Sequence, residues 1–415
     1  MEEQEIIFNG ERAREALAFT KEVVEAYPRR ITGSESCLKT AERIKAELEK
    51  YCDPGTVKME EFTCHPQAFL KYIPFLVVLY LTCSLLLFFD YPIWAFLGFA
   101  LGNFVFYGQF VRYFEILDPL FPRKKGYNVW GKIEPSGQVQ EQVIVSAHHD
   151  AAYVFQLLAR LPRLYAPLMM VGIGFLFLGL VISLIAFILT LFQVGFPQWP
   201  SILLLIGGIS VLPFLFFTTS QVSPAAGDDM IAVAIVLQLA KFFRKVKKEG
   251  KPLRHTRLIF ISFDAEEAGL RGARAFIKAH REELKATRTR VLNIDTIYKL
   301  KHLNFFDRDL NGFVPLSKPL ADECAAIARS LGYPALVSRM SFGGGSTDAA
   351  AFGQTGIEAT NICAMSFNIN DYAEGLMYHT LNDTPEHIEP QAVEAILKVI
   401  KSYIQKKGRE GQNSN

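Results

Sequence analysis

The sequence predicts an α/β fold in which a mixed, mostly parallel sheet is sandwiched by helices, with four transmembrane helices inserted as two hairpins. The first observation is an alternation of strand-like apolar segments with amphipathic, helix-like segments, which is typical of a sheet covered on both faces. The second is a set of long apolar runs that interrupt this alternation, including a stretch from 164 to 227 without any Asp, Glu, Lys or Arg. The remaining polar chain predicts one continuous soluble domain.

The soluble part begins with two segments of helical periodicity, over 10–27 and 36–51, and a strand over 56–64. Further strands are expected at 127–134, 142–150, 256–267 and 289–297, with intervening helices that include 230–248 and 271–284. In open α/β sheets, ligands bind beyond the carboxyl ends of the strands. Functional residues are therefore expected where these strands end.

The apolar runs cover 72–89, 93–111, 166–194 and 201–220. Each approaches or exceeds the roughly 20 residues that a helix needs to cross the hydrocarbon of a bilayer. Buried core helices are the alternative, but aliphatic runs of this length without charge are rare in soluble domains. The runs predict domain boundaries as follows: catalytic-domain segments 1–66, 115–163 and 221–408, hairpins 67–114 and 164–220, and a disordered tail 409–415.

Basic residues predict the orientation of the hairpins. The short turns at 89–93 and 192–200 contain no Lys or Arg, whereas the other flanks carry Lys71, Arg112, Arg123, Lys124, Lys125, Arg160 and Arg163. Positive residues favour the cytoplasmic side, and the acidic N-terminal segment lacks the pattern of a secretory signal. We therefore expect an integral membrane protein whose soluble domain and both termini are cytoplasmic.

Composition excludes several classes of function. The net charge of +2 and the lack of a basic run give no argument for nucleic-acid binding. Six cysteines without paired spacing indicate neither a disulfide framework nor a thiolate zinc site, and they fit a reducing compartment.

Potential metal ligands gather at the predicted strand ends and helix starts. They are His148, His149 and Asp150 in "VIVSAHHD", Asp228 and Asp229 in "AAGDD", Glu266 and Glu267 in "FDAEE", Asp295 in "VLNID", and His379 in "MYHTLND". An isolated acid or histidine at such a place is usually structural. Nitrogen and carboxylate ligands together suit zinc, so their joint position at one edge predicts a zinc site.

The order of these motifs resembles the co-catalytic di-zinc aminopeptidase family, which includes bacterial leucyl aminopeptidases and glutamate carboxypeptidase. The resemblance rests on H-x-D, D-D, E-E-x-G-L, N-x-D and Y-H-T-x-x-D-T, and extends to "YPRRITGSE" at 27–35 and "STDAAAFGQTGIEA" at 346–359. It covers essentially the whole chain outside the two hairpins. The implied ligands of two zinc ions are His148, Asp228, Glu267, Asp295 and His379.

The resemblance also implies individual roles. Asp228 would bridge the two ions, and Glu266 would act as general base. Tyr378 would face the developing oxyanion. Three carboxylates would support the ligands: Asp150 would orient His148, Asp229 would follow a cis peptide, and Asp383 would hold the His379 loop.

The sequence departs from the family pattern at three positions. His149 stands where an aromatic residue is usual, so His149 is an alternative ligand to His148. Ala349 replaces a frequent His after Asp348, which is left out of the predicted site, and Met230 follows the D-D pair where Asn or Asp is common. The Gly-rich "SFGGGS" at 341–346 lacks the lysine of a phosphate loop and is expected at the rim of the substrate pocket.

These observations predict a membrane-embedded zinc aminopeptidase that cleaves peptides with apolar N-terminal residues, with a peptide or aminoacyl substrate and membrane lipid as partners. Hydrolysis of another amide or ester, such as an aminoacyl lipid, is the first alternative. A catalytically silent membrane protein on the same fold is the second, although the complete set of ligands and the base count against it. Cyclisation of N-terminal glutamine, which relatives with a single zinc perform, is disfavoured by the full ligand set.

Overall fold

A nine-stranded sheet forms the centre of the soluble body. The computed structural model describes residues 10–366 and 377–413, and its strands follow the order β1-β2-β6-β3-β7-β11-β8-β10, with β9 paired to β8. The strands are β1 (Lys58–Cys64), β2 (Lys124–Ile133), β3 (Glu141–His148), β6 (Thr256–Phe263), β7 (Arg288–Ile297), β8 (Asn304–Asp309), β9 (Val314–Pro315), β10 (Leu336–Arg339) and β11 (Glu358–Ala364).

The four central strands, β6, β3, β7 and β11, are parallel, while β1, β2 and β8 join antiparallel to their inner neighbours. Residues 143–145 on β3 and 258–261 on β6 are almost completely buried, as expected for strands covered on both faces. The mixed, mostly parallel sheet predicted from the sequence is therefore confirmed. Because the central strands are parallel, their carboxyl ends lie at one edge.

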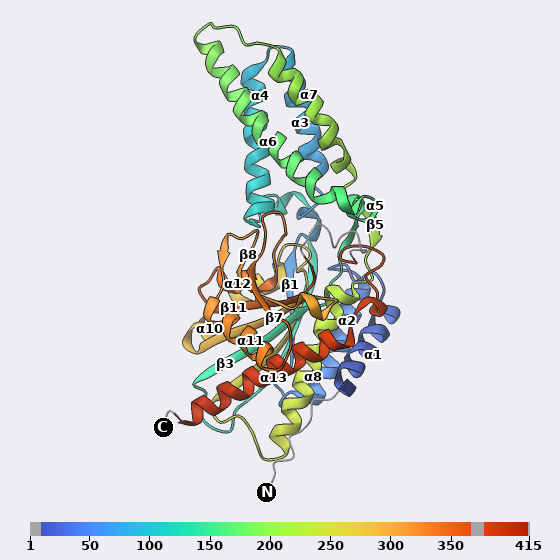
Figure 1. Cartoon of the computed structure of the whole chain (residues 1–415), viewed down its shortest axis with the longest axis vertical. Helices are drawn as coiled ribbons and strands as arrows, with labels where there is room; N and C mark the ends of the chain where they lie inside the picture. The colour runs from blue at the N-terminus through green and yellow to red at the C-terminus, as the bar shows by residue number, and fades with distance from the viewer. Residues whose placement is uncertain (1–9, 367–376, 414–415) are drawn as a thin grey trace.

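Helices cover this sheet (Figure 1). The helices α1 (Gly10–Ala26), α8 (Ile231–Lys248) and α13 (Pro390–Asn413) pack on one another, and α2 (Glu35–Tyr51) packs on α8 and β2. The remaining helices of the body are α9 (Arg271–Ala279), α10 (Arg281–Ala286), α11 (Lys318–Ser330) and α12 (Asp348–Gly353). α8 fills its buried face with residues such as Ile231, Val233 and Leu237. Three of its basic residues lie in the last turn, where they suit the helix dipole.

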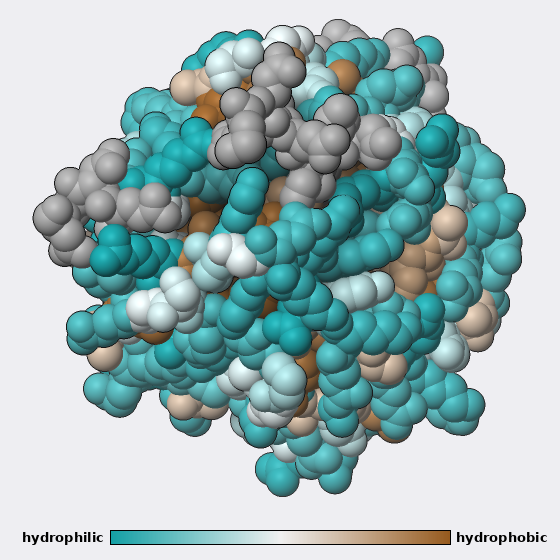
Figure 2. Space-filling model, turned by 90° about the horizontal axis from the view of Figure 1, so that it is seen from below, coloured by the Kyte–Doolittle hydropathy of each residue, from teal (hydrophilic) through white to brown (hydrophobic). Residues whose placement is uncertain are grey.

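The apolar runs form a separate bundle that projects from one end of the body (Figure 1). It contains α3 (Ile73–Phe88), α4 (Pro92–Phe106), α6 (Pro162–Leu191) and α7 (Trp199–Val211). Four helical segments are long and apolar enough to cross a membrane, at 66–88, 92–111, 162–191 and 199–216. The opposite end of the molecule is mainly hydrophilic (Figure 2). The apolar bundle and the hydrophilic surface therefore lie at opposite ends of the molecule.

The structure corrects two predicted boundaries. The run expected as a helix to residue 220 leaves the α-helix at Val211, and Thr218–Val222 forms β5, paired antiparallel with β4 (Tyr153–Phe155). Pro213 lacks the N–H that would continue the helix. At the other end of the chain, α13 continues to Asn413, so residues 409–413 are helical rather than a disordered tail. Lys407 and Glu410 form an ion pair there at 2.9 Å.

The predicted topology can be tested by labelling engineered cysteines in intact cells. The six native cysteines are buried, so background labelling should be low. Asp90→Cys and Gln198→Cys, in the exposed turns of the two hairpins, are expected to react with an impermeant maleimide, whereas Arg409→Cys should react after lysis alone. Labelling of Arg409→Cys in intact cells would place the soluble body outside and contradict the orientation.

Candidate metal centre

The predicted ligands come from five separate segments that meet at the carboxyl edge of the central strands. His148 is the last residue of β3, Glu267 follows β6, and Asp295 lies near the end of β7. Asp228 lies in the irregular turn that precedes α8, and His379 belongs to the loop before α13. All five side chains are largely buried.

These side chains form two groups that share Asp228. One contains His148, Asp228 and Asp295, and the other contains Asp228, Glu267 and His379. Asp228 turns one oxygen to each group: its Oδ1 lies 3.3 Å from His148 Nε2, and its Oδ2 lies 3.2 Å from His379 Nε2. His379 Nε2 is also 3.1 Å from Glu267 Oε1. The sharing of one carboxylate by two donor groups is the arrangement of a two-metal centre.

The donors fit zinc. Two ligand atoms of the same tetrahedral zinc ion, each about 2.1 Å from it, lie about 3.4 Å apart. This separation is close to the distances between these nitrogens and oxygens. The imidazole nitrogens of His148 are buried and make no hydrogen bond of good geometry among the described residues. A buried imidazole that faces carboxylates but makes no hydrogen bond itself is typical of a metal ligand rather than of a structural histidine.

The electrostatics of the metal-free centre favour a bound cation. Burial raises the pKa of Glu266 well above its usual range, and the charges of Asp295 and Glu267 add to this effect although His148 opposes it. Burial likewise raises the pKa of Asp295 to about 7. Burial alone would lower the pKa of His379, but Glu267 and Asp228 raise it to about 10. The centre as a whole, with Glu266 included, therefore contains more carboxylates than the imidazoles of His148 and His379 can neutralise.

Two of the supporting carboxylates tie the strand ends together. Asp150 has its Oδ1 3.4 Å from His148 Nδ1, and it accepts the backbone N–H groups of Glu266 and Glu267 at 3.1 and 3.2 Å. Asp229 accepts the backbone N–H groups of His148 and Thr296, both at 3.2 Å. Asp150 thus aligns β3 with the loop after β6, and Asp229 aligns β3 with β7.

The turn that carries Asp228 has the cis peptide that the resemblance implies, between Asp228 and Asp229. Gly227 is required just before it, because a Cβ atom there would lie 2.1 Å from the ring of Tyr298. The Asp383 carboxylate accepts the N–H groups of Gly227 and Asp228 at 2.6 and 3.3 Å. These hydrogen bonds join the loop that carries His379 and Asp383 to the turn that carries Asp228.

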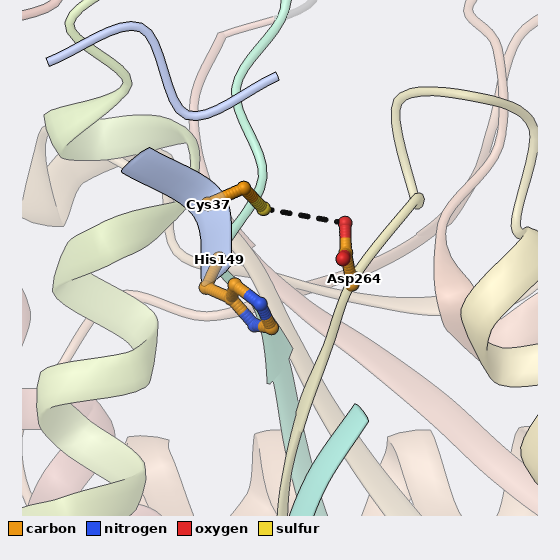
Figure 3. A group of neighbouring side chains, drawn as sticks. All are labelled: Cys37, His149 and Asp264. Atoms are coloured by element: carbon orange, nitrogen blue, oxygen red, sulfur yellow. Dashed lines mark hydrogen bonds between the residues drawn. The ribbon is translucent and has the colours of Figure 1, made fainter. Parts of the chain in front are cut away.

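His149 belongs to a different group. Its ring lies beside Cys37 and Asp264 (Figure 3), and its Nδ1 is 2.9 Å from the Ser262 hydroxyl. Asp264 already accepts hydrogen bonds from the Thr32 hydroxyl at 2.8 Å and the Cys37 thiol at 3.4 Å. The structure thus brings His148, and not His149, to Asp228. Figure 3 shows these three side chains, with the hydrogen bond from the Cys37 thiol to Asp264.

Two residues near the centre are absent from the predicted site. The Thr296 hydroxyl donates to Asp295 at 2.6 Å and lies 3.4 Å from Asp228 Oδ1, so it contacts both carboxylates. Asp348 is buried with neither oxygen hydrogen-bonded within the described part of the chain, and His148 and Asp295 act on it electrostatically. The "STD" motif was a usable signal for Asp348, whereas no sequence pattern marks Thr296.

A pocket with an empty volume of about 1040 Å³ opens onto the two donor groups. Asp228, Glu266, Glu267 and Asp295 form its floor, and its walls include Phe69, Phe110, Tyr113, Phe155, Tyr165 and Phe217. Tyr378 lines the pocket and stacks on the His379 ring at 3.8 Å between centroids. Residues 343–347 contribute to the rim, as expected for the Gly-rich segment.

The fold is shared with several solved enzymes, one of them described as zinc-dependent. A Zn-dependent exopeptidase from Parabacteroides distasonis superposes with a TM-score of 0.54 at 13% identity, over 95% of this chain and 96% of that one. An aminopeptidase from Aneurinibacillus gives 0.52 at 14% identity, over 95% and 93%. A glutaminyl cyclase from an Acidobacteriales bacterium gives 0.56 at 15% identity, over 99% and 98%. The chain thus has the α/β fold common to these enzymes.

The match to a protein-family model covers a smaller part of the chain than these structural matches do. Residues 213–404, which carry every predicted ligand except His148, match the family model for peptidase family M28. A probable glutamate carboxypeptidase from Arthroderma benhamiae is 41% identical over 71 residues, which are 17% of this chain and 10% of that relative's length. The fold and the matched segment together support a zinc metallopeptidase.

Proposed function

We propose that the chain is a membrane-embedded zinc aminopeptidase whose centre holds two zinc ions. The observation that carries this proposal is Asp228, which presents one carboxylate oxygen to each of two donor groups. His148 and Asp295 complete the first group, and Glu267 and His379 complete the second. Glu266, placed beside this centre and outside both of these groups, has the position of a general base.

Bound zinc would lower the pKa of a water molecule and polarise the carbonyl of the scissile amide. Glu266 takes a proton from the attacking water and delivers it to the leaving amine. Its carboxylate reaches within 4.0 Å of His148 Nε2, and Asp150 holds its backbone N–H. Tyr378 lines the pocket and stacks on His379. In this proposal its hydroxyl donates a hydrogen bond to the oxygen of the tetrahedral intermediate.

The reaction type rests on the second donor group. The glutaminyl-cyclase neighbour shows that the fold itself is compatible with another reaction. A single-zinc cyclase needs one donor group, whereas this chain offers two around Asp228. That complete pair favours hydrolysis by an activated water.

Apolar substrates are favoured by the pocket and its location. Aromatic side chains dominate the wall that faces the bundle, among them Phe110, Phe155 and Phe217. β4 and β5 connect the second hairpin to the site, and the Phe155 N–H donates to the His379 carbonyl at 3.1 Å. We therefore propose that the pocket lies at the membrane surface and accepts apolar N-terminal residues. Aminoacyl lipids are the second candidate class of substrate.

The proposal predicts two zinc ions per chain together with aminopeptidase activity. Elemental analysis of the purified, zinc-replete protein should give close to two zinc per chain, and a panel of aminoacyl amides should be hydrolysed with a preference for apolar residues. N-terminally acetylated versions of the same amides serve as controls, because an aminopeptidase requires a free amine. A stoichiometry of one, with cyclisation of N-terminal glutamine substrates, would instead identify a cyclase.

A further inference from the structure

A second cavity lies inside the helix bundle. Its empty volume, including the space that opens to the surroundings of the bundle, is about 610 Å³. No charged side chain lines it among the described residues, and its walls come from four helices and include Leu76, Val77, Met169, Gly172, Val211 and Phe214. Two tyrosines, Tyr72 and Tyr80, line it, and the Tyr80 hydroxyl donates to the Leu204 carbonyl at 2.7 Å. An apolar occupant therefore suits this cavity.

The bundle cavity adjoins the pocket above the metal centre. Phe110 and Phe217 line both spaces. Phe217 packs on Phe155 with 4.7 Å between ring centroids, and Phe155 meets the edge of His379 at 4.2 Å. Phe155 thus lies between Phe217, in the wall of the bundle cavity, and the candidate metal ligand His379.

The two adjoining spaces differ in polarity. The pocket floor is acidic, whereas the bundle cavity offers apolar walls. A single elongated amphiphile matches both, with its amide at the acidic end and its alkyl chain between the helices. Transfer of an alkyl chain from water to such walls is favourable in proportion to the apolar area removed from water.

We propose that the bundle cavity binds a long alkyl chain of the substrate, so that the natural substrates are aminoacyl or peptidyl amphiphiles. This inference rests on the proposed hydrolytic function. Water adds its oxygen to the acyl carbon, the C–N bond breaks, and the amine leaves with the proton that Glu266 returns. A permanently bound lipid is the competing occupant, and the experiment below separates it from the substrate chain.

Two glycines on α6 provide a matched pair of variants. A Cβ atom at Gly172 would point at the Phe214 ring, 3.1 Å away on the cavity wall. A Cβ atom at Gly174 would have nothing within 4 Å, and that residue is exposed on the outer face of the same helix. Gly172→Val therefore narrows the cavity, and Gly174→Val places the same side chain outside it. Val211→Phe narrows the cavity independently from α7.

The experiment measures kcat/KM of the zinc-loaded full-length protein in lipid nanodiscs against two substrate series. Leucyl alkylamides carry the chain on the leaving amine, and 2-aminoalkanoyl ethylamides carry it on the acyl side, each from two to twelve carbons. In at least one series, kcat/KM should rise roughly two- to fourfold per methylene until the cavity is filled. Gly172→Val and Val211→Phe should each reduce the ratio of long-chain to short-chain kcat/KM at least tenfold, whereas Gly174→Val should preserve it.

Each outcome supports or overturns the inference. If the wild-type ratio of long-chain to short-chain kcat/KM is near one in both series and short amides are still cleaved, chain binding is overturned and the hydrolytic function remains. If this ratio stays high in both Gly172→Val and Val211→Phe, chain binding in the cavity is also overturned. The alkyl chain then partitions into lipid, or the cavity holds a resident lipid. Failure of the zinc-loaded protein to cleave any free-amine amide would refute the proposed function itself. Thermal unfolding of each variant confirms that it is folded.

Discussion

Glu266→Gln is expected to lower kcat by roughly two to four orders of magnitude while the protein keeps its full zinc content. The amide side chain preserves the shape of the carboxylate but cannot accept the proton of the attacking water. Glu266 lies outside the two donor groups that share Asp228, but its carboxylate also approaches His148 and Glu267 closely enough to form a further possible donor group. The zinc content of this variant therefore distinguishes a base from a ligand. Steady-state kinetics on an apolar aminoacyl amide, paired with elemental analysis, provides the measurement.

Glu267→Gln is the matched control for this substitution. The two residues are adjacent, and both backbone N–H groups donate to Asp150. Glu267, however, lies 3.1 Å from His379 Nε2 within a donor group. We expect Glu267→Gln to lose metal as well as activity. A kcat for Glu266→Gln close to that of the wild type would remove Glu266 as the base, and loss of zinc from that variant would make it a ligand.

Asp228→Asn should produce the largest loss of metal of any single substitution. Removal of a group that merely supports a ligand typically costs 10–100-fold in metal affinity. Asp228 faces both donor groups directly, so we expect affinity at both sites to fall by more than about 100-fold and hydrolysis to be abolished. Zinc titration against a competing chelator measures this effect.

Asp348→Asn is the comparison for this second prediction. Asp348 is as deeply buried as Asp228, but it belongs to neither of the two groups that share Asp228. We expect the Asp348→Asn protein to retain two zinc ions. If Asp228→Asn also retains two ions at wild-type affinity, the shared carboxylate is not a ligand and the two-metal proposal fails.

Local pattern was sufficient for much of the fold. The strands at 142–150, 256–267 and 289–297 are present as β3, β6 and β7, although each strand as observed is bounded slightly differently. Their apolar runs could be recognised as strands because a parallel strand that is covered on both faces does not alternate apolar with polar residues. β8, β10 and β11 were not predicted. β10 is short and partly exposed, so its hydrophobic signal is weak.

The boundaries of the membrane hairpins show where hydropathy becomes insufficient. An apolar sequence that runs to residue 220 is compatible with one continuous helix. In the structure the α-helix ends at Val211, a 3-10 turn continues to Phe216, and the chain then pairs with β4. Backbone hydrogen bonds between distant segments decided this change. Hydropathy measures the preference of side chains for an apolar environment and carries no information about such pairing.

The sequence alone determined the types of ligand and their order along the chain, because carboxylate and imidazole side chains at strand ends are recognisable from local pattern. The tertiary structure decided which of them meet. His148 and His149 are equivalent as sequence, but side chains on successive positions at a strand end point to opposite faces, and Asp228 lies on the His148 side. The approach of the bundle cavity to the metal centre likewise depends on Phe110 and Phe217, which are distant in sequence. Such proximity results from the packing of the whole chain, which no local window of residues contains.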